Sequence, residues 1–134
     1  MKNSKLLPAI GIGTIAVLAA CSEPPLPEEI VAERAQARWN AVIEKDFEAA
    51  WAFYSPGFRQ QNDEAVFRVD MARRPVQWQS AGLESVQCEE ARCEAEFTVG
   101  YKAVGAPGVL SGFEGERTVD EIWIEIDGQW WYAK

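Results

Sequence analysis

The chain has 134 residues, about half of them apolar, which permits one compact domain and disfavours extended disorder. Its 13 lysines and arginines stand against 21 acidic residues, giving a formal net charge of −8, and the sequence contains no histidine. Without histidine, Ser-His-Asp and Cys-His nucleophile systems and histidine-ligated zinc or haem sites are excluded. The acidic balance argues against a nucleic-acid partner, because such binding depends on neutralising phosphates with Lys and Arg.

Residues 1–20 have the plan of a secretory signal peptide. Lys2 and Lys5 give a short positive start, and residues 6–20 carry no charge. The uncharged stretch is interrupted by a proline and two glycines, and it is shorter than the roughly 20 apolar residues that a membrane-spanning helix needs. We therefore expect residues 1–20 to be removed.

The junction after this leader reads Leu18-Ala19-Ala20-Cys21 and resembles the lipobox of bacterial lipoproteins. In that family the cysteine thiol receives a diacylglyceryl group, and the cysteine becomes the new N-terminus. The resemblance implies lipidation at Cys21, palmitate-type acyl chains as the contact with the membrane, and a cell-envelope protein that faces the periplasm. Ser22 resembles the residue that follows the cysteine in lipoproteins sent to the outer membrane. The alternative is a plain secretory signal with a chance cysteine.

The residues that follow predict a tether and then helices. Residues 21–27 contain three prolines, which favour an extended spacer because proline fixes φ and lacks an amide donor. Beyond it, apolar residues recur at three- and four-residue steps, which predicts helices over 28–44, 47–54 and 63–74. Most charged residues of the first helix, Arg38 among them, are expected on its solvated side.

After the third helix the apolar period changes to two. This change predicts strands over 78–88 and 93–101, joined by a four-residue loop. In that hairpin Cys88 faces Cys93, and Glu84 shares the face of the two cysteines. Opposed cysteines in an exported protein are expected to be oxidised, so the three cysteines divide into one lipid anchor and one disulfide.

The C-terminal residues give a strong hairpin signal, because Asp127-Gly128 joins two apolar segments over 118–126 and 129–133. Alternation places a row of isoleucines on one face. We predict that this row packs on the helices and that the other face is a contact surface for a protein partner or a second copy. The alternative reverses the faces, with the tryptophans inside and the isoleucines against a dimer mate. The predicted contact surface consists of Glu121, Trp123, Glu125, Trp130 and Tyr132.

Helices followed by a curved antiparallel sheet are similar to the nuclear-transport-factor-2-like fold, also called the cystatin-like cone. The resemblance covers residues 28–134 and rests on two runs, Trp39 to Phe58 with Tyr54-Ser-Pro-Gly before the phenylalanine, and Glu121 to Trp131 with Asp-Gly before its end. It implies an α+β domain in which three N-terminal helices pack on about four strands. The family includes isomerases, cyclases and dehydratases with an acid–base pair in the cone, and also binding and dimerising modules.

These observations favour a lipid-anchored binding module for an apolar small molecule or an envelope protein partner. We expect no catalysis, no cofactor and no metal. One alternative is a histidine-free lyase or isomerase that uses a carboxylate and a tyrosine in the cone, for which Tyr54, Glu84 and Tyr101 are the pocket candidates, with Asp70 and Glu121 as further acids. The other alternative is a structural envelope protein that dimerises through its sheet.

Overall fold

The computed structural model describes residues 21–105, 108 and 111–134, so the expected signal peptide over 1–20 lies outside the described residues. Helices precede strands in the chain. No helix of the described part is long and apolar enough to cross a membrane. The elements are α1 (Pro27–Ile43), α2 (Phe47–Trp51), α3 (Pro56–Gln61), α4 (Glu64–Arg73), β1 (Val76–Glu89), β2 (Arg92–Ala103), β3 (Glu114–Ile126) and β4 (Gln129–Ala133).

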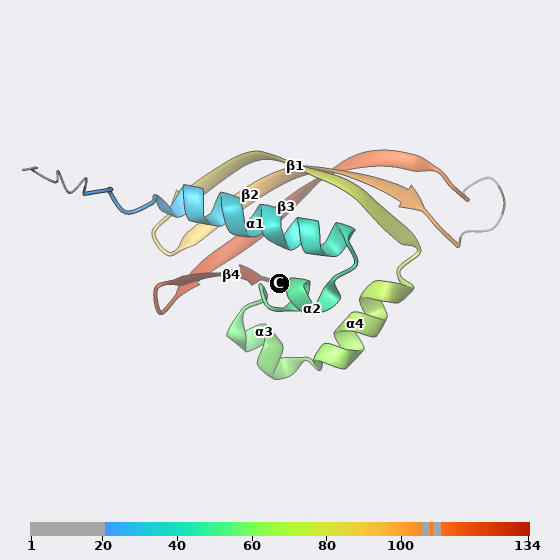
Figure 1. Ribbon diagram of the computed structural model, residues 1–134, viewed down its shortest axis with the longest axis horizontal. Helices are drawn as coiled ribbons and strands as arrows, with labels where there is room; N and C mark the ends of the chain where they lie inside the picture. Colours follow the sequence, from blue (N-terminus) through green and yellow to red (C-terminus); the bar gives the residue numbers. More distant parts are fainter. Residues whose placement is uncertain (1–20, 106–107, 109–110) are drawn as a thin grey trace, which may run out of the picture.

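The four strands form one antiparallel sheet in the order β1-β2-β3-β4. All four helices lie on one side of this sheet, with α1 along the sheet and α2 to α4 beyond it (Figure 1). The predicted α+β architecture, helices first and then an antiparallel sheet, is confirmed. Because these helices are all on the same side, the sheet has one covered face and one face that no helix of the described residues covers.

Side-chain caps set where two of the helices begin. The Asp46 carboxylate accepts a hydrogen bond from the N–H of Ala49 at 3.0 Å, and Asp63 accepts one from Val66 at the same distance. Each bond satisfies a first-turn amide that has no partner within its own helix. The helix starts predicted at these two aspartates are confirmed.

The second predicted helix is shorter in the structure, and a helix that was not predicted follows it. The prediction extends to residue 54, but α2 ends at Trp51, and α3 begins at Pro56, beyond the predicted range. The Ser55 hydroxyl accepts a hydrogen bond from the N–H of Phe58 at 3.3 Å and so caps α3. Proline is compatible with the first position of a helix because that amide has no intrahelical partner. The Ser-Pro pair, predicted to be a stop, therefore starts a helix, and the described residues contain four helices instead of three.

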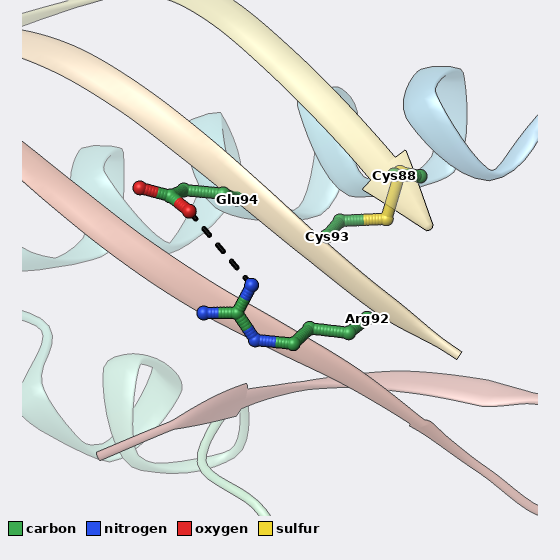
Figure 2. The surroundings of a disulfide bond; sticks show 4 residues. All are labelled: Cys88, Arg92, Cys93 and Glu94. Carbon is green, nitrogen blue, oxygen red and sulfur yellow. Dashed lines mark ion pairs between the residues drawn. A yellow bond between two sulfur atoms is a disulfide. The ribbon is translucent and has the colours of Figure 1, made fainter. Parts of the chain in front are cut away.

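The first hairpin has the predicted register at its tip. Cys88 pairs with Cys93, Val86 pairs with Ala95, and a disulfide joins the two cysteines. Figure 2 shows this bond beside β2, where the flanking Arg92 forms an ion pair of 3.8 Å with Glu94. The bond links neighbouring strands across a short turn, so it fixes the pairing of this hairpin more than it restricts the whole chain.

Further along the hairpin the prediction for Glu84 is wrong. Leu83 pairs with Phe97 and Ser85 pairs with Glu96, so Glu84 is an extra residue in β1 without a partner. Such a bulge shifts the alternation by one residue. The Glu84 side chain is consequently exposed instead of facing inward with the cysteines.

The last hairpin follows the predicted register throughout. Ile126 pairs with Gln129, and the pairing continues in step to the end of β4. Asp127 and Gly128 have φ values of 52° and 77°, the left-handed pair that a two-residue hairpin turn of type I′ requires. The Asp-Gly pair predicts this turn directly, because both residues tolerate the positive φ that the turn needs.

The predicted assignment of the two sheet faces is wrong, and the alternative holds for the inner face. Trp123 is 0% exposed and Trp130 is 3% exposed, and both belong to the core that packs under α1. Glu121 is buried with them, whereas Glu125, near the hairpin end, is exposed. Large aromatic side chains fill a curved sheet and bury more area than isoleucines do. The proposed contact surface of tryptophans is therefore part of the core.

Trp39 of α1 links this helix to the sheet. Its ring meets Trp78 edge-on, with 5.6 Å between ring centroids, and lies 6.1 Å from Phe97. Edge-to-face aromatic pairs at such distances add to the stabilisation from burial alone. Aromatic rings thus fill a large part of the core between α1 and the covered face of the sheet.

Trp123→Ala is expected to lower the free energy of unfolding by about 3–5 kcal/mol, because it leaves a large cavity in a small core. Thermal or denaturant unfolding measures this loss. Ile124→Ala, the neighbouring position on the uncovered face, is the control and should cost less. A melting temperature of Trp123→Ala close to that of the unchanged protein would contradict the core placement.

Candidate functional site

A buried ion pair joins α1 to β3. Arg38 is 4% exposed and Glu121 is 1% exposed, and the guanidinium donates a hydrogen bond to Oε1 of the carboxylate. The other oxygen, Oε2, accepts a hydrogen bond from Trp123 Nε1 at 3.1 Å. Removing two charges from water is unfavourable unless their polar atoms find partners. Here both carboxylate oxygens have one.

Arg38 occupies a position that the sequence analysis placed on the solvated side of the first helix. In the structure it continues the buried stripe of Val31, Ala35 and Val42, at helical steps of three and four residues. The expectation for Arg38 is therefore wrong, because the buried stripe itself contains a charged residue. Two features of the sequence indicated a buried pair. Arg38 occupies a position of the apolar stripe, and Glu121 shares a face with the tryptophan of its strand.

Aromatic rings surround the Arg38 guanidinium. Its central carbon lies 4.3 Å from the ring centroid of Tyr132 and 4.8 Å from that of Trp39. Tyr132 in turn meets the Tyr54 ring edge-on at 4.9 Å. A cation over aromatic faces is attracted by the negative face of each ring, and more so when water is excluded. These contacts fix the orientation of the arginine and of both phenols.

Backbone hydrogen bonds join β4 to the connection between α2 and α3 beside these rings. The N–H of Tyr132 donates to the carbonyl of Phe53 at 2.8 Å, and the N–H of Ser55 donates to the carbonyl of Tyr132 at 2.9 Å. They form a parallel bridge between β4 and the connection from α2 to α3. Two segments that are distant in sequence therefore carry the two tyrosines to the same place.

A cavity of about 240 Å³ opens beside the ion pair. A second cavity of about 450 Å³ lies next to it and shares four lining residues, Val42, Met71, Arg74 and Trp78. Small-molecule sites in proteins commonly measure 300–1,000 Å³ and are mainly apolar, with a few converging polar groups. The smaller cavity is lined by Arg38, Trp39, Val42, Tyr54, Met71, Arg74, Trp78, Arg117, Val119, Glu121, Tyr132 and Lys134.

Burial determines the protonation of the two tyrosines in this cavity. It raises the pKa of Tyr54 to about 12, although the nearby Arg38 charge acts in the opposite direction. Burial also raises the pKa of Tyr132, again opposed by Arg38. A buried phenol resists ionisation because its charged form loses hydration. Both hydroxyls are consequently neutral at neutral pH and can donate or accept a hydrogen bond.

The structure brings together only some of the predicted site residues. Tyr54 lines the cavity as expected, and Glu121 and Tyr132, predicted for an outer surface, line it as well. Glu84 is exposed on the bulge of β1, and Tyr101 lies against Trp78 with 6.3 Å between ring centroids. Neither of these two lines the cavity. The carboxylate near Tyr54 is therefore Glu121 and not Glu84.

Arg117 and Lys134 also line the cavity and are not among the predicted site residues. The predicted strand starts at residue 118, whereas β3 begins at Glu114. Alternation along the longer strand places Arg117 on the same face as Glu121, and the alternation of β4 continued past Tyr132 carries Lys134 to the same cavity. An earlier strand start would have identified the first of these residues.

No protein-family model and no curated protein sequence matches the chain. Solved structures do. A SEC-C-motif-containing protein from Rhodopseudomonas palustris superposes with a TM-score of 0.58 at 18% identity, covering 75% of this chain and 73% of that one. A protein from Streptomyces avermitilis, assigned as a dehydratase of the NTF2-like family, gives 0.53 at 14% identity, with 78% and 90% covered.

An LEH-like epoxide hydrolase from Mycobacterium tuberculosis also gives a TM-score of 0.53, at 16% identity, with 83% of this chain and 80% of that one covered. At such identities the similarity concerns the fold alone. The chain has the NTF2-like fold, in which a curved sheet and its helices form a cone. Structures with this fold belong to enzymes as well as to binding proteins, so the chemistry of a particular cone depends on its own lining.

Replacing one partner of the buried ion pair, by Glu121→Leu or by Arg38→Met, is expected to cost about 3–5 kcal/mol of unfolding free energy, because the remaining charge is left buried without a counter-charge. The double variant Arg38→Met with Glu121→Leu should lose much less than the sum of the single changes. Denaturant unfolding of the four proteins measures this coupling. Arg92→Gln, at the exposed pair with Glu94, is the control. Additive losses would contradict a coupled pair.

Proposed function

We propose that this protein is a lipid-anchored, periplasm-facing binding module that takes an apolar small molecule into its cone. The observation that carries the proposal is the pair of adjoining cavities of about 240 and 450 Å³, with Val42, Met71 and Trp78 on the wall of both. Apolar side chains dominate this shared wall. Such a lining stabilises a ligand chiefly by removing its apolar surface from water.

The surroundings of Glu121 support binding over acid–base catalysis. A general base must lie within hydrogen-bond reach of the proton that it removes. The Glu121 side chain is 0% exposed, and its two oxygens accept hydrogen bonds from Arg38 and Trp123, so the carboxylate is packed inside the core. A histidine-free lyase or isomerase would have to expose this carboxylate before Glu121 could act.

The proposed anchor is Cys21, which is exposed and carries a free thiol. Residues 21–26 have no helix or strand, are exposed throughout and extend beyond the start of α1 (Figure 1). Such a segment suits a spacer between acyl chains and a folded domain. Two or three acyl chains hold a protein at a bilayer without a transmembrane helix, since each buried CH₂ contributes about 0.8 kcal/mol.

Self-association through the sheet is the second candidate function. Ile122, Ile124 and Ile126 lie on the face opposite Trp123, where no helix covers the sheet, and they are only partly buried. A second copy could cover this row. The cone remains the first candidate, because cavities enclosed by both helices and strands form a built site within one chain.

Binding in the cone can be measured with N-phenyl-1-naphthylamine, an uncharged apolar dye that fluoresces when it leaves water. Because the dye also fluoresces in detergent micelles, binding is the signal of the full chain in a non-ionic detergent above that of the same detergent without protein. Met71→Trp should abolish this binding because the larger ring fills the wall of both cavities. Val66→Trp, which adds the same ring at an exposed position of α4, should bind normally. Equal dye signals from Met71→Trp and the unchanged protein would refute the site.

The anchor is tested separately. Cys21→Ser removes the thiol that would receive the diacylglyceryl group, so the protein should lose its acyl chains and its membrane association in cell fractions. Ser22→Ala leaves that thiol in place and should remain acylated. Mass spectrometry of the native N-terminus provides the measurement. An unmodified N-terminus that begins at another residue would contradict the lipoprotein proposal.

A further inference from the structure

The lining of the cone has the opposite charge to the protein as a whole. The chain carries a formal charge of −8 with 21 acidic residues. Only one of those acids, Glu121, lines the 240 Å³ cavity. Four cationic side chains line the same cavity, namely Arg38, Arg74, Arg117 and Lys134.

Among the described residues only one of these four cations has an ion-pair partner. Glu121 forms its ion pair with Arg38, and among the described residues Arg74, Arg117 and Lys134 form none. Burial lowers the pKa of Lys134, and the charges of Arg74 and Arg38 lower it further. A lysine whose pKa is lowered by two arginine charges lies close enough to them to be repelled. An anion placed between them would remove this repulsion.

Two buried donors on the same cavity wall have no partner. Nε of Arg38 and Nε1 of Trp39 are both buried without a hydrogen bond, in side chains that are 4% and 5% exposed. A buried N–H that lost water and gained no acceptor is unfavourable, and most such groups in proteins are satisfied. Because their atoms are buried from solvent, these two groups add to the positive character of the wall and do not themselves contact a ligand in the cavity.

The adjoining cavity supplies an apolar region beside the cations. Its wall contains Ile43, Phe47, Val76 and Val104 in addition to the four shared residues, and it includes Lys45 but no acid. Arg74 belongs to both cavities and therefore stands where they meet. A molecule with an acidic group and an apolar body fits this division better than a uniformly apolar one does.

We infer that the cone binds an amphipathic organic anion, with its acidic group among Arg74, Arg117 and Lys134 and its apolar body against Val42, Met71 and Trp78. This inference rests on the proposed binding function and specifies its ligand class. Arg38 contributes less free charge than the other three cations because Glu121 pairs with it.

The test compares two dyes that differ by one acidic group. The sulfonate dye 1-anilinonaphthalene-8-sulfonate has the same rings as the uncharged N-phenyl-1-naphthylamine. Both are titrated into the full chain in a non-ionic detergent, and the signal of the same detergent without protein is subtracted. We expect the sulfonate to bind more tightly at low salt and to weaken as salt rises, because ions screen partly exposed charges. Binding of the uncharged dye should be insensitive to salt.

Variants then locate the acidic group. Arg74→Gln and Arg117→Gln should each weaken sulfonate binding about fivefold more than they weaken binding of the uncharged dye, the loss expected for one partly exposed ion pair. Both side chains belong to exposed residues, and thermal melting verifies that the variants fold. Arg92→Gln removes the same charge at the far hairpin tip and should change neither affinity.

The possible outcomes distinguish a failure of this inference from a failure of the proposed binding function. If both dyes bind alike and all three variants resemble the unchanged protein, the anion inference is overturned while binding in the cone stands. If neither dye binds, the proposed function fails and the inference fails with it. If Arg92→Gln weakens the sulfonate as much as Arg74→Gln does, the attraction comes from overall charge and the inference is again overturned.

Discussion

The interior of this domain is organised around one buried ion pair, Arg38 with Glu121. It connects the longest helix to the third strand across the middle of the core, and Trp123 and Tyr132 pack directly on it. Such a pair is tolerated only where the surrounding groups hold both charges in good geometry. The aromatic residues therefore have a double role, since they fill the core and also orient the charges.

The same pair explains which face of the sheet is covered. Glu121 needs a partner of opposite charge, and α1 provides one from its buried stripe. A helix packed on the isoleucine row would have left Glu121 on the open face and Arg38 buried without a counter-charge. The charged residues thus fix the choice that hydrophobic area alone leaves open, which is why alternation by itself gave the wrong face.

Much of the fold was predictable because its signals are local. The apolar period separates helices from strands, Asp46 and Asp63 cap helices, and Asp127-Gly128 adopts the backbone of its turn. The bulge at Glu84 was not predictable from alternation, since one inserted residue leaves no mark in composition. The site was harder still. Arg38 and Glu121 are 83 residues apart, and only packing of the whole domain brings them together.

The two edge strands of the sheet, β1 and β4, influence whether molecules aggregate when they are crowded together. An edge strand with regular, unpaired backbone groups invites another chain to add to it. Here β1 is irregular at two points, between Trp78 and Ser80 and between Leu83 and Ser85. At the other edge β4 has five residues, and Tyr132 already uses its backbone for the bridge to Tyr54. Neither edge offers a straight template, so the sheet is protected against aggregation by strand addition even at high local concentration.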